Sequence, residues 1–489
     1  MSLDDMDVIR RPKIIEQPHI LGPGTDFFTE DGRPVRPQPS AHTIHKVFSG
    51  SALDLNAMGG LDDQAPPLEE GGHGQDDATM SSIFQQVNND SDRERNKASK
   101  NKTTVLVVGG NGFVASHVVA LLLQAGYTVR ITVSEPLEST EQLSLYSMVP
   151  DAGHRLSVTE ADMTNAASFR DVIRGCKYVI HCGVSQSQAL REKDVVRAHV
   201  ESVQALFDAI RLNGKPTLKR VILTGSAAAV FNIQDPTPAS GKFDESSWNN
   251  RATAKTDPVP FAKLSFEREA WRLQKMFGVE LIVILPSIVV GPSLLHETSE
   301  AMRTILDLAS GSSVFPFAPN LFWNFVDVRD VAVAHVRAME HADLTDQRLI
   351  VSNQCLSLSE IGKLIKRSFP HLNPPTQTAP TWITLIVAPL SHARVKLSFL
   401  WRTLGVRKAL DSSKSIRLLD LQLTPMEVTV ADAVSQLISS GYLAPPPTAE
   451  QQAVIDNANA TKTLLTRALV GLSFASVAAA VVFKIRSKK

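Results

Sequence analysis

The sequence predicts an α/β protein built on a doubly wound parallel sheet of the Rossmann type, with a smaller C-terminal substrate lobe. Three observations predict this class. Strand-like runs alternate with helix-like runs from residue 103 to about residue 445, the strand-like runs are almost continuously apolar, and a glycine-rich turn follows the first of them. Uninterrupted apolar strands are typical of a parallel sheet that helices cover on both faces.

Six segments are predicted as buried strands, because each is a short run rich in Val, Ile and Leu. Between them lie helical runs such as VASHVVALLLQAG and LREKDVVRAHVESVQALFDAIRLN. The predicted strands are TTVLVV (103–108), TVRITV (128–133), RLSVTEAD (155–162), KYVIHCG (177–183), KRVILTGS (219–226) and VELIVILPS (279–287).

Composition narrows the class of protein further. The chain has 489 residues, of which 43% are hydrophobic, which is enough for a large core. Fifty basic residues balance fifty acidic ones, so nothing in the charge indicates a nucleic-acid partner. The cysteines, Cys176, Cys182 and Cys355, match neither a metal site nor a disulfide framework, which predicts a reducing, intracellular compartment and no metal. The N-terminus has no apolar signal-peptide core, so no secretory signal is expected.

Residues 1–102 have the composition of a disordered region. They are rich in Pro, Gly, Asp, Asn and Ser, and no Lys or Arg occurs between Lys46 and Arg93. A segment with so few apolar residues cannot bury enough surface to offset the entropy of ordering its chain. We therefore expect a disordered tail, with a short protein-binding helix inside it as the alternative.

The C-terminal end predicts a membrane anchor. A linker, 446–463, leads to the apolar stretch 464–484, which includes 16 consecutive uncharged residues and is followed by the basic tail 485–489. As a helix, those uncharged residues would extend about 24 Å, slightly less than a ~30 Å bilayer core. The alternative is a helix packed on the catalytic lobe. A second apolar stretch, 380–390, is too short to span and is expected to graze a membrane or to line the substrate lobe.

An anchor at this end inserts only after synthesis of the chain is complete. We therefore expect a single-pass protein whose main domain lies in the cytosol. A short, moderately apolar span with a basic flank suits the mitochondrial outer membrane or the endoplasmic reticulum.

A glycine-rich turn carries the strongest functional signal. The run VLVVGGNGFVASHVV places Gly109, Gly112 and Ala115 in a G-x-x-G-x-x-A pattern, directly after a buried strand and at the start of a helix. Gly109 permits the tight turn, Gly112 lets the backbone approach a pyrophosphate, and Ala115 keeps helix and strand close. The N–H groups at a helix N-terminus attract phosphate. The pattern predicts a binding site for a nicotinamide dinucleotide.

With this turn, further segments resemble the extended short-chain dehydrogenases/reductases over about residues 104–443. The chain is most similar to the dihydroflavonol-reductase and cinnamoyl-CoA-reductase branch, within the NAD-dependent epimerase/dehydratase and 3β-hydroxysteroid-dehydrogenase group. The resemblance divides the domain 103–445 into a cofactor part, mainly 103–285, and a substrate lobe, mainly 286–445. The similar segments are GYTVRITV (126–133), EADMTN with Asp162, YVIHCGVS (178–185), RVILTGSAAAVFN (220–232), FDESSW (243–248), LPSIVVGP (285–292), NFVDVRDVAVAHVRAME (324–340) and 410–443.

The resemblance implies NAD or NADP as cofactor and a catalytic Ser, Tyr and Lys, with the Tyr and Lys one turn apart on a helix. The Tyr exchanges a proton with the substrate oxygen, the Lys lowers the pKa of that Tyr and holds the ribose, and the Ser orients the carbonyl. Ser226 stands at the Ser position and Lys263 at the Lys position. The residues assigned to the cofactor are Gly109, Gly112, Phe113, Val114, Ala115, Asp162, Met163, Lys263 and Pro286.

The Tyr position holds Val259, which cannot transfer a proton. The chain has four tyrosines, and none is near Lys263 in the sequence: Tyr127, Tyr146, Tyr178 and Tyr442. His199 stands where many members of the class carry an Asn, and a His can donate a proton near neutral pH. Two interpretations stay open: the site is degenerate, or His199 or a water held by Ser226 replaces the phenol.

The cofactor preference also stays open. NAD-preferring members carry an Asp or Glu at the end of the second strand, where this chain has Val133. NADP-preferring relatives carry an Arg one residue later, where this chain has Ser134. Arg130 is expected to lie along the strand, and Glu135 is close enough in sequence to reach a ribose.

These features predict a membrane-anchored NAD(P)-dependent oxidoreductase that acts on a hydroxyl or carbonyl group of a small, lipophilic, sterol-like substrate. The alternative is a catalytically degenerate dinucleotide-binding scaffold or redox sensor, favoured by Val259. The expected partners are the small-molecule substrate and the membrane, and a homodimer is compatible with the sequence.

Overall fold

The structure, a computed structural model, describes residues 100–135, 145–147, 149, 153–183, 192–214, 217–295, 299–311, 317–387 and 397–446. The predicted disordered region 1–102 lies outside these residues up to residue 99, but its end at residues 100–102 is described, and there Lys100 pairs with Glu340 at 2.7 Å. The linker from residue 447 onward, the predicted anchor 464–484 and the basic tail 485–489 also lie outside. Within the described part of the chain, no helix combines the length and the apolar character that crossing a membrane requires.

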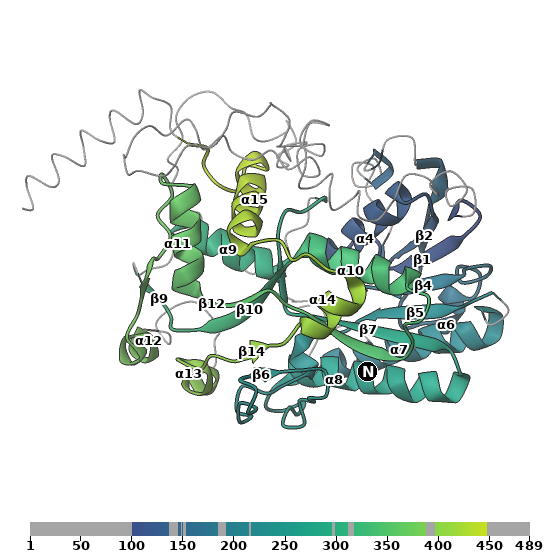
Figure 1. The fold of residues 1–489 in the computed structure, drawn as a ribbon, viewed down its shortest axis with the longest axis horizontal. Helices are drawn as coiled ribbons and strands as arrows, with labels where there is room; N and C mark the ends of the chain where they lie inside the picture. Colours follow the sequence, from purple (N-terminus) through teal and green to yellow (C-terminus); the bar gives the residue numbers. More distant parts are fainter. Residues whose placement is uncertain are drawn as a thin grey trace, which may run out of the picture. The chain divides into compact units, whose positions relative to one another are not determined.

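A seven-stranded sheet forms the centre of the cofactor part (Figure 1). Its order is β11-β7-β5-β4-β1-β2-β3, and every neighbouring pair is parallel. This confirms the predicted Rossmann sheet. Because the strand order reverses between β1 and β4, the ligand crevice of such a sheet lies beyond the carboxyl ends of these two strands. The strands are β1 (Thr104–Val108), β2 (Thr128–Val133), β3 (Leu156–Glu160), β4 (Tyr178–His181), β5 (Arg220–Thr224), β7 (Glu280–Pro286) and β11 (Gln347–Val351).

The edge strand β11 is the one strand of this sheet that is not among the predicted segments. Its apolar run is short and begins next to Arg348, a residue that is unfavourable in a buried strand unless its charge is paired. In the structure Arg348 Nε donates to Glu267 Oε1 at 2.6 Å, and β11 pairs in parallel with β7. The strand therefore depends on a partner that is distant in sequence.

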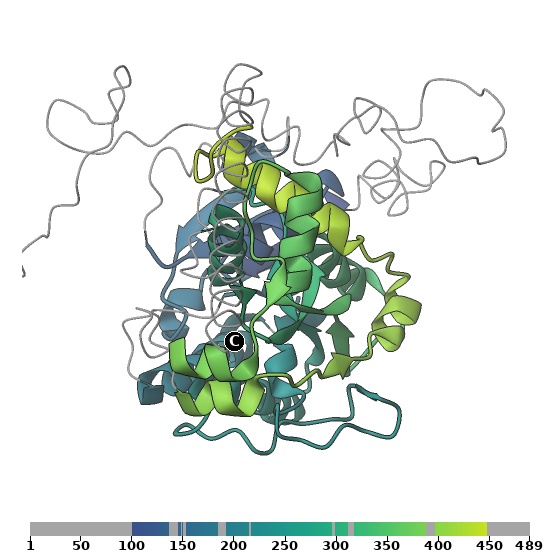
Figure 2. The ribbon, with the colours of Figure 1, turned by 90° about the vertical axis from the view of Figure 1, so that its left-hand side faces the viewer.

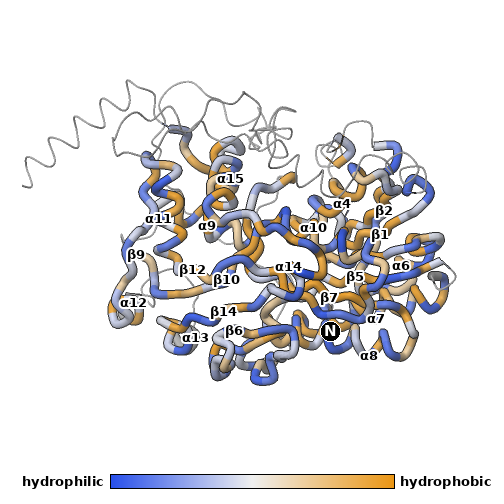
Figure 3. The backbone as a smooth tube through the Cα atoms, in the orientation of Figure 1, coloured by the Kyte–Doolittle hydropathy of each residue, from blue (hydrophilic) through white to orange (hydrophobic). Residues whose placement is uncertain are grey.

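Helices cover both faces of the sheet, and the alternation along β1 shows why. Val105 and Val107 belong to one hydrophobic cluster with α4 (Phe113–Gln124) and α10 (Val328–Glu340). Leu106 and Val108 belong to a second cluster with α6, α7 and α8 on the other face. The tube in Figure 3 is accordingly hydrophobic along the central strands β1, β5 and β7. The bounds of these helices are α6 (Ala166–Phe169), α7 (Glu192–Ala209) and α8 (Pro258–Phe277).

A C-terminal lobe with its own hydrophobic cluster begins where β7 ends. Its sheet has the order β12-β10-β8, with β10 and β12 antiparallel and β10 and β8 parallel. Two two-stranded sheets, β13-β9 and β14-β6, complete the pairing among the described residues. The elements are β8 (Ile288–Val290), α9 (Glu300–Ser310), β9 (Phe317–Ala318), β10 (Phe322–Asp327), β12 (Gln354–Ser357), α11 (Leu358–Ser368), β13 (Gln377–Thr378), β14 (Ala409–Leu410), α14 (Ser413–Leu419), α15 (Met426–Ser439) and, from the cofactor part, β6 (Lys242–Phe243).

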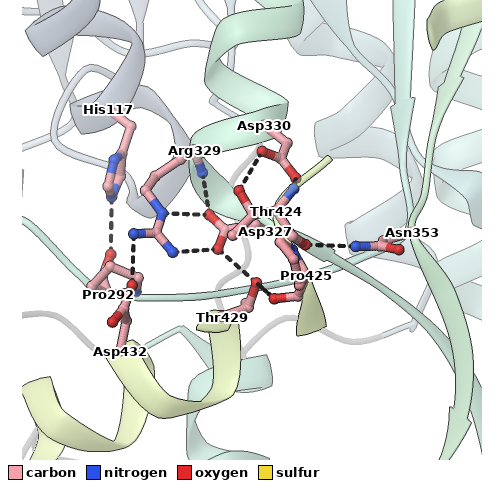
Figure 4. A network of polar contacts seen from close by, with 10 residues as sticks. All are labelled: His117, Pro292, Asp327, Arg329, Asp330, Asn353, Thr424, Pro425, Thr429 and Asp432. Atoms are coloured by element: carbon pink, nitrogen blue, oxygen red, sulfur yellow. Dashed lines mark hydrogen bonds and ion pairs between the residues drawn. The ribbon is translucent and has the colours of Figure 1, made fainter. Parts of the chain in front are cut away.

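A buried ion-pair network joins the start of α10 to α15 (Figure 4). Asp327 accepts hydrogen bonds from Arg329 Nε at 2.9 Å and Arg329 Nη2 at 2.7 Å, and Arg329 Nη1 reaches Asp432 at 2.7 Å. Thr429 Oγ1 donates to the same Asp327 carboxylate at 2.8 Å. Asp330 accepts from the backbone and the hydroxyl of Thr424, both at 2.8 Å. The segment 324–340 thus fixes the last helix of the lobe against the cofactor part.

Candidate active site

The glycine-rich turn has the backbone of a phosphate cradle. Gly109 follows β1 with a φ of +72°, a conformation that favours glycine. Its N–H donates to Thr132 Oγ1 at 3.2 Å, and the N–H of Gly112 donates to the Gly109 carbonyl at 3.0 Å. Helix α4 then begins at Phe113, so the first-turn N–H groups of Phe113 and Val114 face the crevice end of the sheet.

Three loops meet at this turn. A Cβ atom on Gly109 would lie 2.6 Å from Gly183 Cα, and a Cβ atom on Gly183 would lie 2.6 Å from Met163 Sδ. Gly183 follows β4 and Met163 follows β3, so the carboxyl ends of β1, β3 and β4 converge. Beside Met163, Asp162 is exposed, and its Oδ1 accepts hydrogen bonds from the N–H and the hydroxyl of Thr164, both at 2.8 Å.

The geometry of this crevice fits a dinucleotide. Glycine occupies the positions where a Cβ atom would clash, Gly109 and Gly183. The N-terminus of α4 points its N–H groups to this turn, and the first turn of α4 holds no acidic residue that would repel a phosphate. Ala115, next to the turn, is buried on the sheet side of α4. NAD or NADP would therefore be held by the residues after β1, β3 and β4.

The adenosine ribose of a dinucleotide would lie at the end of β2. Among the described residues, no charged side chain is fixed there by a hydrogen bond or an ion pair. Val133 is buried at the end of β2, while Ser134 and Glu135 are exposed. Arg130 points elsewhere: its Nη1 donates to the carbonyls of Val172 and Arg174 at 2.5 and 3.2 Å. Arg130 thus holds the turn before β4.

Ser226 lies just beyond the carboxyl end of β5, next to the crevice. It is half-buried and caps a short 3₁₀ turn, where its Oγ accepts from the N–H of Ala228 at 3.2 Å. Two residues earlier, the Thr224 hydroxyl donates to His335 Nε2 at 2.7 Å, because His335 Nδ1 already donates to the Val331 carbonyl. This bond fixes the end of β5 against α10.

Helix α8 presents Val259 and Lys263 one turn apart. Val259 is 56% exposed. Burial lowers the pKa of the Lys263 ammonium to about 8, so a substantial fraction of this group is neutral slightly above neutral pH. The helix starts at Pro258 with Asp257 as its N-cap residue, and proline at this position favours the first turn.

Two buried histidines, His199 and His181, lie close enough to Lys263 for its charge to act on them, and only His199 was predicted from the sequence. His199 on α7 and His181 at the end of β4 both lie against the ring of Phe266, with centroid distances of 6.1 and 5.6 Å. Burial, and then the charge of Lys263, lower the pKa of both imidazoles to about 4. His199 Nδ1 donates to the Val195 carbonyl at 2.8 Å. His199 is therefore neutral at pH 7, and its Nε2 is an acceptor.

Some buried ring nitrogens in this cluster have no hydrogen-bond partner. Within the described chain, nothing bonds to Nε2 of His199 or to either ring nitrogen of His181. Such groups are rare in proteins, and a catalytic role or a bound water is among the reasons for which they occur. His181 could have been suspected from the sequence, because it ends a predicted strand two residues before Gly183.

No tyrosine replaces Val259 from elsewhere in the described structure. Tyr127 and Tyr178 stand at the amino ends of β2 and β4, opposite the crevice, and Tyr127 Oη donates to Glu340 at 2.7 Å. Tyr146 packs against Gly153, which precedes the amino end of β3. Tyr442 follows α15 in the C-terminal lobe. The last predicted cofactor residue, Pro286, is buried at the carboxyl end of β7, where the lobe begins.

Comparison with known proteins identifies the class. Residues 105–351, about half of the chain, match the NAD dependent epimerase/dehydratase family. The chain belongs to this family, and the predicted membership of the extended short-chain dehydrogenases/reductases is confirmed. The cofactor of the class is NAD(P), and its chemistry here is that of an oxidoreductase.

Similar proteins are reductases. Tetraketide alpha-pyrone reductase 1 of Arabidopsis thaliana is 30% identical over 346 residues, which cover 70% of this chain and 97% of that protein. Cinnamoyl-CoA reductase 2 of the same plant is 28% identical over 355 residues, which cover 72% of this chain and 97% of that protein. Among solved structures, yeast methylglyoxal/isovaleraldehyde reductase complexed with NADPH has a TM-score of 0.57 at 25% identity, covering 70% of this chain and all (100%) of that one.

Proposed function

We propose that this protein reduces a carbonyl group, or oxidises the corresponding hydroxyl group, on a small lipophilic molecule. The observation that carries the proposal is that the Gly109 turn, Ser226 and His181 lie at the carboxyl edge of one parallel sheet, with the Lys263 ammonium close enough to His181 that, after burial, its charge also lowers the pKa of the imidazole. NAD(P), when bound, supplies or accepts the hydride. The chain's own residues then have to hold the substrate oxygen and move a proton.

Ser226 is the residue placed to orient the substrate oxygen. Its hydroxyl accepts one hydrogen bond from the Ala228 N–H, so its proton is available for the carbonyl oxygen. That donation would stabilise the negative charge that develops on the oxygen.

Lys263 is our candidate for the proton source. In the reductive direction a hydride adds to the carbonyl carbon, the π electrons move to oxygen, and the resulting alkoxide needs a proton. With Val259 in place of a phenol, the Lys263 ammonium would deliver that proton through a water molecule and be reprotonated from solvent. A pKa of about 8 suits this role, whereas a pKa of about 4 leaves His199 without a proton to give at Nε2.

The second candidate is a dinucleotide-binding scaffold or redox sensor. The observation that favours it is Val259, because a lost phenol removes the usual proton donor. The two candidates differ in turnover. A sensor binds the reduced cofactor without oxidising it, whereas a reductase binds the cofactor and oxidises it.

The deciding experiment uses the full chain. NADH and NADPH binding is measured by calorimetry, and cofactor oxidation is then followed against a panel of ketones that includes sterol ketones. Ser226→Ala and Lys263→Ala should each lower kcat/KM by ~10²-fold or more. The exposed Lys255→Ala is the matched control and should change nothing. Tight binding without turnover would select the sensor, and a rate that survives both alanine changes would exclude this crevice from the reaction.

The lipophilic, sterol-like substrate and the membrane location belong to the same proposal. Their support is the uncharged run of 16 residues between Arg467 and Lys484, with basic residues on both sides, and the family resemblance. A C-terminal anchor at the mitochondrial outer membrane or endoplasmic reticulum would keep the reductase domain in the cytosol, next to substrates that dissolve in the bilayer.

A further inference from the structure

Two short helices of the C-terminal lobe expose tryptophan side chains. Helix α12 (Thr381–Val387) carries Trp382, which is 64% exposed, and α13 (Leu397–Thr403) carries Trp401, which is 75% exposed. These values exceed those of the other exposed large hydrophobic side chains among the described residues. The two helices contact each other, and α12 lies at the left of the ribbon in Figure 1, on the side that faces the viewer in Figure 2.

Exposed indoles have a specific meaning at a membrane. A Trp side chain has an apolar body and a polar N–H, and it concentrates at the headgroup level of bilayers. In water, two exposed indoles on contacting helices are an unfavourable arrangement that indicates an interaction surface. Trp382 and Trp401 therefore define a surface, which we call the tryptophan face.

The charge of the surrounding chain indicates which surface it meets. The 50 residues between Glu360 and Asp411 contain eight Lys or Arg residues and no Asp or Glu. Lys363 and Arg367 of this segment are exposed on α11. Arg402, Arg407 and Lys408 bond within the protein, so among the described residues of this segment the exposed charges of Lys363 and Arg367 are those that complement anionic lipid headgroups. The predicted anchor 464–484 lies less than twenty residues beyond Pro446, the last described residue, so the same membrane is within reach.

The tryptophan face is connected to the catalytic helix. Arg402, next to Trp401, pairs with Asp257 at 3.4 Å, and both side chains are largely buried. Asp257 is the N-cap residue of α8, and the exposed Val259 follows two residues later. The helix that carries Lys263 thus starts beside the helices that carry the tryptophans.

We propose that the tryptophan face docks on an anionic lipid bilayer, with Trp382 and Trp401 at the headgroup level, and that this contact places the crevice beside Val259 at the membrane surface. A lipophilic carbonyl compound dissolved in the bilayer then enters the crevice without crossing water. The entry of substrate rests on the proposed function, whereas the docking itself does not.

The docking is tested with the full chain and vesicles of phosphatidylcholine and phosphatidylserine, in which part of the lipid carries brominated acyl chains that quench tryptophan. The native protein should lose fluorescence on these vesicles, and less so as salt is raised. The variant Trp382→Phe with Trp401→Phe keeps Trp248, Trp271 and Trp323 as reporters and should not be quenched. Since residues 464–484 contain no tryptophan, insertion of the anchor alone gives no signal. Unquenched native protein, or equal quenching in the variant, would overturn the docking.

A second variant separates docking from catalysis. Trp382→Ser with Trp401→Ser should raise KM severalfold for a carbonyl substrate dissolved in vesicles and leave KM unchanged for a water-soluble one. The exposed Met276→Ser is the matched control on α8 and should alter neither KM. If the native enzyme shows no turnover, the proposed function fails while the quenching result still decides the docking. If ultracentrifugation without lipid shows dimers that the double Ser variant loses, the face binds a second copy and the membrane proposal is wrong.

Discussion

A Cβ atom on Gly109 would lie 2.6 Å from the Cα atom of Gly183, so the turns after β1 and β4 touch backbone to backbone. This contact closes one side of the crevice and leaves the pyrophosphate position bounded by main chain. A side chain on Gly109 would therefore meet the Gly183 backbone, and a side chain on Gly112 would compete with the cofactor for the same space.

The cradle is tested by Gly112→Asp, which should abolish NAD(P)H binding. A Cβ atom on Gly112 would stand 3.2 Å from the Gly109 carbonyl oxygen, and the added carboxylate would meet the phosphates at the start of α4. Calorimetry measures the loss. Gln124→Asp, exposed at the other end of the same helix, adds the same charge and should bind normally. Equal affinity in both variants would show that the phosphates bind elsewhere.

The missing phenol is tested by Val259→Tyr. Because Val259 is 56% exposed, the larger ring needs no repacking, and the new hydroxyl would stand one turn from Lys263. We expect kcat for carbonyl reduction to rise by ~10-fold or more, as expected when a general acid is added. Val259→Phe has the same size without the hydroxyl and should give no gain. A similar rate in the Tyr and Phe variants would mean that the proton path does not pass this position.

The pH profile tests Lys263 as the proton source. An acid must be protonated to act, and burial lowers the pKa of Lys263 to about 8. The rate of reduction should therefore be constant below about pH 8 and fall above it. Lys263→Met should remove that alkaline limb together with most of the rate. An unchanged limb in this variant would assign the titration to another group.

The ion-pair network is tested by Arg329→Leu. This change leaves the carboxylate of Asp327 buried without its cation, and breaking such a pair costs about 3–5 kcal/mol of stability. Urea unfolding measures the free energy. The exposed Arg197→Ala on α7 is the control and should have little effect, because water screens exposed pairs. A small loss for Arg329→Leu would mean that α10 and α15 are held together by apolar contacts alone.

The anchor is tested by deleting residues 464–489. Alkaline carbonate should leave the full chain in the membrane pellet and release the truncated chain, because carbonate removes proteins held only at the surface. Cofactor affinity should be equal in both. A full chain that washes off would contradict the anchor, and a truncated chain that stays in the pellet would place the membrane attachment elsewhere.

The parts of the fold that depend on neighbouring residues could be predicted from the sequence. The strand, the Gly109–Gly112 turn and helix α4 are contiguous, and their spacing alone specifies the cradle. Five of the six predicted strands, β1, β2, β4, β5 and β7, were predictable because each is a mostly buried apolar run, whereas the edge strand β3 buries only Leu156. Val259 was identified from its spacing to Lys263, since four residues make about one turn of a helix.

The tertiary structure decided what depends on distant partners. Strand β11 forms because it pairs with β7 and because Glu267 pairs with its Arg348. His181 joins the site through its contact with Phe266 and the nearby charge of Lys263. Arg402 pairs with Asp257 at the start of the catalytic helix. The tertiary structure also determined that His199 is neutral, since its pKa depends on burial and on the charge of Lys263. The physical reason is common to all of these: local pattern specifies an element, but the contacts, burial and charge of a side chain are set by segments that only folding brings together.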